Sequence, residues 1–173
     1  MELIKATLKD FQRLTEFYRD VIMYTEDMRI YGRWVYGEHP TDDMILGYIK
    51  SGSMYYCERD GIIVSAVGIT LCQDEDYNDT LWSTSLKNNE VSVVHILCVN
   101  PKLQKQGIAR ETMELVIGLS RSLGKKAVRL DALSCNIPAQ RLYESIGFKK
   151  MSCRRWYAEN VGWADFFLYE LVL

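Results

Sequence analysis

The run from Val94 to Ala109 reads Val-His-Ile-Leu-Cys-Val-Asn-Pro-Lys-Leu-Gln-Lys-Gln-Gly-Ile-Ala. Its apolar, β-rich beginning predicts a buried strand over Val91 to Val99, which the Asn-Pro pair ends. A helix is then expected to open at Gly107. The first N–H groups of a helix have no partner within it, and the helix dipole is positive there. This turn therefore predicts an anion site, in which Gly107 presents no Cβ to a bound phosphate.

One glycine leaves two interpretations open. The turn either binds a phosphate, with Lys105 and Arg110 adding positive charge, or it merely starts a helix. The spacing fits neither the P-loop pattern G-x-x-x-x-G-K-[ST] nor the dinucleotide pattern G-x-G-x-x-G. The rest of the chain must therefore decide between them.

Upstream of this run, hydrophobic spacing and turn residues predict two helices and three strands. They are a strand over Leu3–Thr7, a helix capped by Thr7 to Asp10 with a stripe of Leu8, Phe11, Leu14, Tyr18 and Val21, a helix over Asp42–Lys50, and a hairpin of Ser53–Arg59 and Ile62–Cys72 that turns at Asp60-Gly61. The polar segment Gln73–Glu90 exceeds the usual loop length and is expected to be a mobile lid or a surface insertion.

Downstream of the run, the pattern predicts two more helices and three more strands. They are a helix from Gly107 to Leu123 with an apolar stripe of Ile108, Leu115, Leu119 and Leu123 and a stop at Gly124, a strand over Ala127–Ala132, a helix over Ile137–Ile146, and strands over Phe148–Tyr157 and Trp163–Val172. The strand–helix–strand crossover from Val91 to Ala132 implies a parallel pair within a mixed sheet.

Composition narrows the class of protein. The 173 residues suit one domain spanning 1–173, with 48% apolar and 25% charged residues. A net charge of -2 gives no reason to expect nucleic acid, and no apolar run reaches the ~18 residues of a membrane span. Five cysteines without C-x-x-C spacing are expected to be reduced core thiols of a cytoplasmic protein. No metal site is expected, because His39 and His95 are the only histidines and neither lies near a cysteine pair.

Two motifs make the pattern specific. Gln104 to Ala109 fits [Q/R]-x-x-G-x-[G/A], and Asn136 to Phe148 fits N-x-x-A-x-x-L-Y-x-x-x-G-F. Together, at this separation, they resemble the GNAT acetyltransferases, although Ala109 stands where many members have glycine. The resemblance implies an α/β (α+β) GNAT acyl-CoA acyltransferase fold: a mixed, mostly antiparallel sheet of about seven strands flanked by about four helices.

The resemblance also implies acetyl-CoA (coenzyme A) as cosubstrate and a set of residues that bind it. The backbone amides of the turn would hold its pyrophosphate, from residues Gln104, Lys105, Gln106, Gly107, Ile108 and Ala109. Leu97, Cys98 and Val99 match the family's β-bulge, whose backbone pairs with the pantetheine arm and presents an N–H to the thioester carbonyl. Asn136 matches a position that contacts the pantetheine.

Two catalytic roles follow from the same resemblance. Tyr143 matches the general acid that protonates the departing thiolate; its alternative is an aromatic that packs on the last helix. His95 is the candidate base, with Glu90 as second choice, and its alternative is a core histidine held by one hydrogen bond. Strand alternation predicts that Val93, His95 and Leu97 share one face.

The acceptor side is the least determined. Tyr24, Tyr31, Trp34 and Tyr36 lie between the first two helices, which often shape the acceptor pocket in this family. The acidic loop from Gln73 to Asp79 either steers a cationic amine or is simply solvated. Trp156 and Trp163 are candidates for the pocket wall, a homodimer contact or the core.

The resemblance therefore implies an N-acetyltransferase that moves an acetyl group from acetyl-CoA to an amine of a small molecule or peptide. Direct attack in a ternary complex is expected, because Cys98 is the only nearby thiol and has no evident activating base. The alternative is a non-catalytic acyl-CoA-binding sensor or interaction module; the presence of both Tyr143 and the Gln104–Ala109 turn favours the enzyme. Another acyl donor or an O-linked acceptor also stays open.

Overall fold

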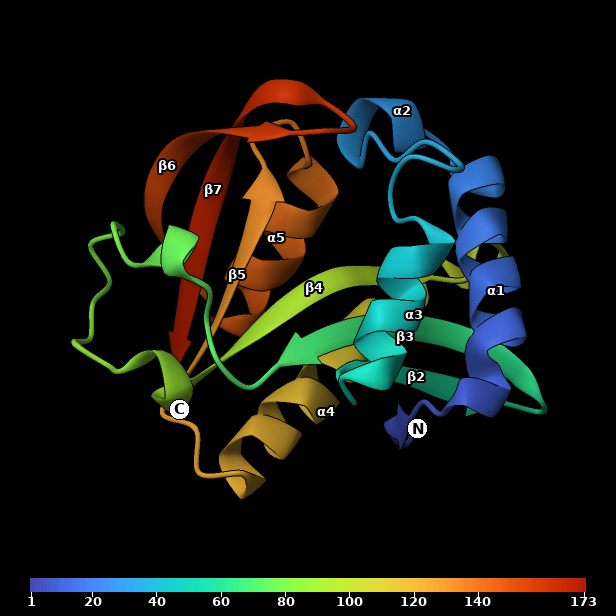
Figure 1. The fold of residues 1–173 in the computed structure, drawn as a ribbon, viewed down its shortest axis with the longest axis horizontal. Helices are drawn as coiled ribbons and strands as arrows, with labels where there is room; N and C mark the ends of the chain where they lie inside the picture. Colours follow the sequence, from blue (N-terminus) through green and yellow to red (C-terminus); the bar gives the residue numbers. More distant parts are fainter.

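The computed structural model describes residues 1–173, which form one seven-stranded sheet in the order β1-β2-β3-β4-β5-β7-β6 (Figure 1). The strands are β1 Ile4–Lys5, β2 Met54–Arg59, β3 Ile62–Thr70, β4 Val91–Val99, β5 Ala127–Leu133, β6 Lys149–Ala158 and β7 Gly162–Val172. The helices are α1 Phe11–Tyr24, α2 Met28–Tyr31, α3 Asp42–Lys50, α4 Ile108–Ser122 and α5 Ile137–Ile146. Only β4 and β5 run parallel, so the mixed, mostly antiparallel sheet that we expected is confirmed.

Helices cover both faces of this sheet. Leu14 and Tyr18 of α1 and Ile45 of α3 pack with Met54 on one face. On the other face, α4 and α5 enclose a cluster that includes Tyr143 and strand residues of β3, β4, β5 and β7. Figure 1 shows α1 and α3 side by side over one half of the sheet, with β6, β7 and α5 in the other half.

Local turn chemistry places the elements largely as expected. Asp60 and Gly61 both have positive φ, 51° and 78°, which is the tight turn that joins β2 to β3. Gly124, with φ 71°, follows the end of α4. The predicted stripe on the first helix is wrong at one end, because Leu8 lies in a short 3₁₀ turn and is 63% exposed.

The predicted apolar stripe of α4 is partly wrong. Of the four expected residues only Ile108 is buried; Leu115 and Leu119 are half-buried, and Leu123 is exposed. The buried face instead includes Thr112 and Ser120, whose hydroxyls bond Ser65 and Ser92 of the sheet at 2.7 Å. Because each of these hydroxyls has a hydrogen-bond partner on the sheet, polar residues can lie on the packed face of the helix. The stripe predicted from the leucines is therefore displaced by about one residue.

The segment 73–90, which we expected to be a mobile lid or a surface insertion, lies largely at the surface and is anchored to the sheet. Arg129 of β5 donates to Glu170 of β7 at 2.7 Å, and its guanidinium lies 4.1 Å from the Trp82 ring centroid. The Thr84 hydroxyl donates to the same Glu170 carboxylate at 2.9 Å. A buried ion pair thus holds the segment in place.

The cysteines only partly follow the prediction. All five are free, but Cys72 and Cys153 are exposed and Cys135 is half-buried, so only Cys57 and Cys98 are core thiols. Cys153 lies on the edge strand β6, which presents every second side chain to solvent, and Cys72 follows the end of β3. None of the helices has the length and apolar character that crossing a membrane would require.

Candidate functional site

The site begins where β4 and β5 separate. The two strands pair in parallel from Val91 opposite Ala127 to Val94 opposite Leu130, and the pairing ends there. Beyond it β4 keeps β3 as a neighbour, with Cys98 opposite Ala66 and no partner on its other side. The sheet therefore opens into a V between β4 and β5, which leaves backbone groups of β4 free to bond an extended ligand.

A bulge lies at the same place. Gly68 of β3 pairs with His95 and Ala66 pairs with Cys98, so Ile96 and Leu97 both face the single residue between them. Ile96 takes a φ of 42°, and the Tyr18 hydroxyl donates to its carbonyl at 3.0 Å. We expected the bulge at Leu97, Cys98 and Val99; it begins one residue earlier, because Ile96 is the extra residue.

The bulge also corrects the predicted faces of β4. Val93 packs with Tyr77 and Leu168, on the face that carries His95, whereas Leu97 packs against the α4 and α5 cluster on the other face. One added residue reverses the alternation, so His95 and Leu97 do not share a face.

The turn before α4 is a concave set of unpaired amides. The N–H groups from Lys105 to Arg110 donate to no carbonyl or side chain of the protein. Lys105 and Gly107 have positive φ, 62° and 81°, and a Cβ added to Gly107 would meet nothing within 4 Å. Successive free amides at a helix start form an anion site, and Gly107 keeps its concavity open.

The flanking residues of this turn are fixed by contacts across the fold. The Gln104 amide donates to the Thr25 hydroxyl at 3.1 Å, and Arg110 donates to the Ser145 hydroxyl at 2.7 Å. The Lys105 ammonium lies 3.8 Å from the Glu26 carboxylate with both side chains largely exposed. Both cationic side chains are thus accessible beside the turn, although each has a carboxylate within 4 Å, Glu26 for Lys105 at 3.8 Å and Glu114 for Arg110 at 3.9 Å.

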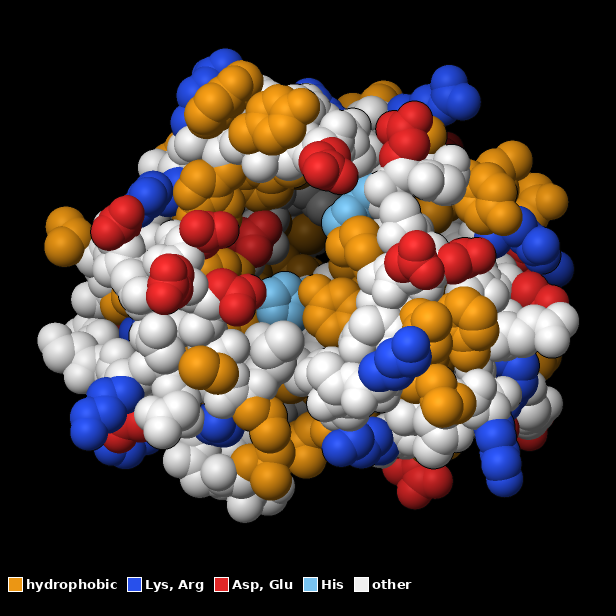
Figure 2. Space-filling view, in the orientation of Figure 1, with side chains coloured by type: hydrophobic (Ala, Val, Ile, Leu, Met, Phe, Trp, Pro, Cys, Tyr) orange, Lys and Arg blue, Asp and Glu red, His pale blue; other side chains and the backbone are white.

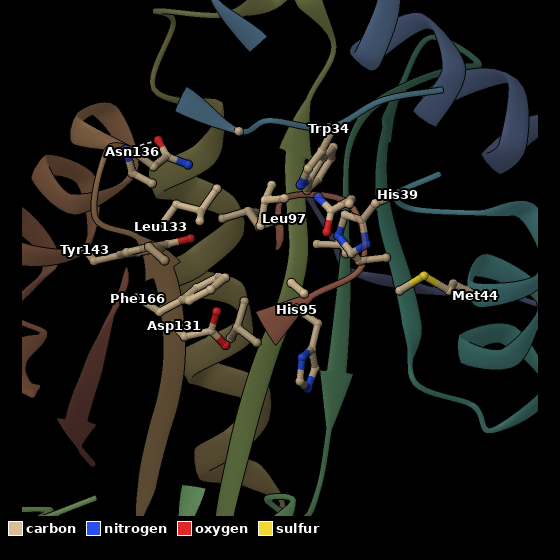
Figure 3. Close-up of a pocket in the computed structure, with 18 of the residues that line it drawn as sticks. Trp34, His39, Met44, His95, Leu97, Asp131, Leu133, Asn136, Tyr143 and Phe166 are labelled. Atoms are coloured by element: carbon tan, nitrogen blue, oxygen red, sulfur yellow. Dashed lines mark hydrogen bonds between the residues drawn. The ribbon is translucent and has the colours of Figure 1, made fainter. Parts of the chain in front are cut away.

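A cavity of about 320 Å³ lies between the separating strands. Its wall includes Trp34, His95, Leu97, Asp131 and Tyr143 (Figure 3). Figure 2 shows the hollow open on one face of the molecule, with histidine in its wall and acidic side chains grouped along one side. These five residues come from four separate segments of the chain, which meet at one concave space.

Tyr143 lies in the wall of this cavity. Its ring packs against Phe148 and Tyr169, each with ring centroids 5.9 Å apart, and the side chain is buried. Figure 3 shows its hydroxyl directed away from α5, toward the cavity. Burial raises the pKa of Tyr143 above its usual value, and the charge of Asp131 adds to that rise. The phenol therefore stays protonated at neutral pH.

His95 also lines the cavity. Its Nε2 shares a hydrogen bond of 3.0 Å with the Thr70 hydroxyl, and its ring lies 5.7 Å from the ring of Tyr48. Burial lowers the pKa of His95 below its usual value, and Asp131 and Asp74 oppose that shift. Glu90, our second choice of base, is wrong: its carboxylate binds Lys126 at 2.5 Å at the far end of β4.

Asp131 is a site residue that sequence reasoning missed. It is the first residue of β5 beyond the paired region, as His95 is on β4. The Tyr77 hydroxyl donates to its carboxylate at 2.5 Å, and burial raises the pKa of Asp131 while this hydrogen bond opposes the rise. The signal was present as an acidic residue inside the apolar strand Ala127–Leu133.

Some of the remaining predicted residues line the cavity and others do not. Asn136 lines the cavity, and its side-chain oxygen caps α5 by accepting from the Ala139 N–H at 3.2 Å. Of the four aromatics between the first two long helices, only Trp34 reaches the cavity, while Tyr24 and Tyr36 are exposed. Trp156 is half-buried between Tyr77 and Phe166, against a small core cluster; Trp163 is 65% exposed on the β6–β7 hairpin.

Comparison with known proteins gives a consistent result. The sequence model of the Acetyltransferase (GNAT) family matches residues 14–148. The [ribosomal protein bS18]-alanine N-acetyltransferase of Haemophilus ducreyi is 29% identical over 105 residues, and the match spans 61% of each chain. That similarity therefore extends over less than two thirds of the relative.

Solved structures share the fold. A GNAT-family acetyltransferase of Streptococcus agalactiae superposes with a TM-score of 0.75 at 13% identity, covering 99% of this chain and 95% of that one. A Salmonella typhimurium protein solved with its cofactor acetyl-CoA gives a TM-score of 0.71 at 18% identity, covering 100% and 94%. At these identities the likeness concerns the fold.

Proposed function

This chain belongs to the acetyltransferase (GNAT) family, and from that premise we propose that it transfers the acetyl group of acetyl-CoA to an amine of a small molecule or peptide. One observation carries the proposal. The turn before α4 presents unpaired amides, and the V between β4 and β5 opens at a cavity that Tyr143 lines. A pyrophosphate, an extended pantetheine arm and a thioester occur in that order in acetyl-CoA.

The residues present fit this cosubstrate. The amides of Gln104, Lys105, Gln106, Gly107, Ile108 and Ala109 would bind the pyrophosphate, because free N–H groups at a helix start favour an anion. Backbone groups at Leu97, Cys98 and Val99 would bond the pantetheine arm as an added strand. Asn136 caps α5 with its oxygen, which leaves its side-chain NH₂ group for the same arm.

The reaction removes two protons from the acceptor nitrogen and delivers one proton to the departing thiolate. The acceptor enters as an ammonium ion and loses one proton, which His95 would accept through water. The nitrogen lone pair then forms a C–N bond to the thioester carbonyl carbon. As the C–S bond breaks, its electron pair leaves on sulfur, and Tyr143 would give that thiolate a proton. The nitrogen sheds a second proton, which restores Tyr143, so one proton in total goes to solvent for each amide and thiol formed.

Direct attack is favoured over an acyl-enzyme. Cys98 is buried, and burial raises the pKa of its thiol well above its usual value. A protonated thiol is a poor nucleophile, and no base lies beside it to remove the proton. The acetyl group is therefore expected to pass in a single step within a ternary complex.

Two further points belong to this proposal. The five free cysteines agree with a cytoplasmic setting. The acceptor of the Haemophilus ducreyi relative is an alanine of a ribosomal protein, and a peptide N-terminus falls within the amine class proposed for this chain.

A thiol-release assay tests the proposal. Acetyl-CoA is incubated with the protein and a panel of polyamines, amino acids, amino-acid amides and short peptides. Release of free thiol that depends on one amine, with the acetylated amine confirmed by mass spectrometry, is the expected result. Tight binding of acetyl-CoA without turnover of any amine would instead indicate a non-catalytic acyl-CoA-binding module.

A further inference from the structure

Two carboxylates on one face of the sheet, the buried Glu170 and the half-buried Asp131, have very different partners. Glu170 of β7 is matched by the Arg129 guanidinium at 2.7 Å and by the hydroxyls of Ser83 and Thr84. Burial would raise the pKa of Glu170, but these hydrogen bonds lower it below its usual value. This carboxylate has its cation within the fold, as a buried charge requires.

Asp131, two residues beyond Arg129 on β5, has no such cation. None of the ion pairs of the structure includes it. Its one side-chain hydrogen bond comes from the Tyr77 hydroxyl and occupies one carboxylate oxygen. The Tyr77 ring is itself stacked on Trp82, so the segment 73–90 fixes the orientation of Asp131. The second oxygen keeps its acceptor capacity for whatever enters the cavity.

The cavity is suited to a positive charge. No lysine or arginine lines it, and Asp131 is its only acidic residue. The exposed acidic side chains of the segment 74–79, from Asp74 to Asp79, lie on this side of the molecule, and the charge of Asp74 acts on His95 inside the cavity. An entering cation is therefore attracted at the mouth and paired within, while an entering carboxylate meets like charge.

The position of Asp131 puts this charge at the reaction centre. Asp131 and His95 directly follow the last paired residues of β5 and β4, at the closed end of the V, and Tyr143 lines the same cavity. Building on the proposed function, we propose that Asp131 binds the acceptor ammonium and selects amines that carry no carboxylate beside the reacting nitrogen. Amino-acid amides, peptide N-termini and polyamines satisfy that condition; free α-amino acids do not.

The same carboxylate assists the attack. The amine becomes neutral when it loses its first proton, but the nitrogen regains a positive charge as its lone pair forms the C–N bond. A carboxylate beside the nitrogen thus stabilises both the bound ammonium and the charge that develops in the transition state. Asp131 therefore affects kcat as well as KM for the amine, without contacting the part of acetyl-CoA held by the Gln104–Ala109 turn.

The test compares alaninamide with alanine, which differ in the carboxylate next to the amine. Wild-type protein is expected to prefer alaninamide in kcat/KM by more than tenfold. Asp131→Asn keeps the shape and the acceptor for Tyr77 but removes the charge, so kcat/KM for alaninamide should fall about 10- to 100-fold, as for a lost charge-assisted hydrogen bond. The preference over alanine should shrink by about tenfold, because repulsion of the carboxylate is lost together with the attraction.

Two controls separate this role from a structural one. Asp20→Asn makes the same charge change on α1, where the Asp20 side chain is 52% exposed, and should leave both substrates unaffected. The affinity of Asp131→Asn for acetyl-CoA, measured by calorimetry, should match that of the wild type. The intrinsic difference in reactivity between alanine and alaninamide cancels, because the ratio of their kcat/KM values is compared between the wild type and each variant.

The outcomes are distinguishable. Wild-type protein that uses alanine as well as alaninamide overturns the role of Asp131 while the proposed function stands, and this holds whether or not the variant folds. Unchanged selectivity in Asp131→Asn overturns it as well. Wild-type protein that acetylates no amine of the panel removes the proposed function and, with it, this inference.

Discussion

The Tyr143→Phe substitution is expected to change the rate of acetyl transfer but hardly the stability of the fold, because the packing of the ring does not depend on its hydroxyl. Its ring is 7% exposed and packs against two aromatic neighbours, Phe148 and Tyr169. The hydroxyl makes no hydrogen bond with the protein, so removing it breaks no internal contact. Since a neutral hydrogen bond contributes about 0.5–1.5 kcal/mol, we expect the free energy of unfolding to change by less than about 0.5 kcal/mol.

The effect on the rate should be far larger. Burial keeps the Tyr143 phenol protonated, so it can supply a proton to the departing thiolate throughout the neutral range. Loss of a general acid costs about 10²–10⁴-fold. That range corresponds to about 2.7–5.4 kcal/mol of barrier. The reduction should be in kcat, with the affinity for acetyl-CoA retained, because the hydroxyl acts on the leaving group rather than on the pyrophosphate.

Tyr169→Phe is the matched control. The two rings belong to one cluster, but the Tyr169 hydroxyl donates to Glu144 at 3.2 Å and does not line the cavity. This variant should lose about 0.5–1.5 kcal/mol of stability and keep its kcat. Thiol release under saturating acetyl-CoA, together with urea unfolding, measures both quantities. A Tyr143→Phe protein that turns over within about threefold of the wild type, well below the general-acid range, would refute the assignment.

Other substitutions test the remaining parts of the site and the fold. Gly107→Val should lower the affinity for coenzyme A at least about tenfold by calorimetry, whereas Gly37→Val, at a similar φ of 82° in open space, carries the same backbone strain and should bind normally. A base must be deprotonated, so kcat/KM should rise with pH through the lowered pKa of His95, below ~6.5. Measured with two acceptors of different amine pKa, this limb should stay fixed and vanish in His95→Gln; a limb that follows the acceptor makes His95 structural. Arg129→Met leaves the Glu170 carboxylate buried without its cation and should lower the free energy of unfolding by about 3–5 kcal/mol, measured in urea. A urea midpoint above that of the wild type would contradict this expectation.

The elements of this fold could be predicted because their signals are local. Hydrophobic period two or 3.6, an Asp-Gly turn and a glycine after a helix each act within a few residues. The strands and the four longer helices were therefore predicted within a few residues of their ends, whereas the short α2 was not predicted. The anion-binding turn belongs to the same class, since unpaired amides and a Gly107 with positive φ follow from one short run. The family motifs placed Tyr143 at the cavity for the same reason, because an N-cap at Asn136 sets the phase of α5.

Pairing across distant segments decided the rest. The bulge at Ile96 depends on how β3 meets β4, and it turned Leu97 to the face opposite His95. Asp131 acquires its role only when Tyr77, 54 positions earlier in the chain, is folded against it. The stripe of α4 was misjudged because its polar residues are satisfied by hydroxyls of the sheet. A short stretch of sequence specifies backbone conformation, but it does not specify which carboxylate finds a cationic partner. Glu170 has Arg129 and Asp131 has no such partner, and this difference arises from tertiary contacts alone.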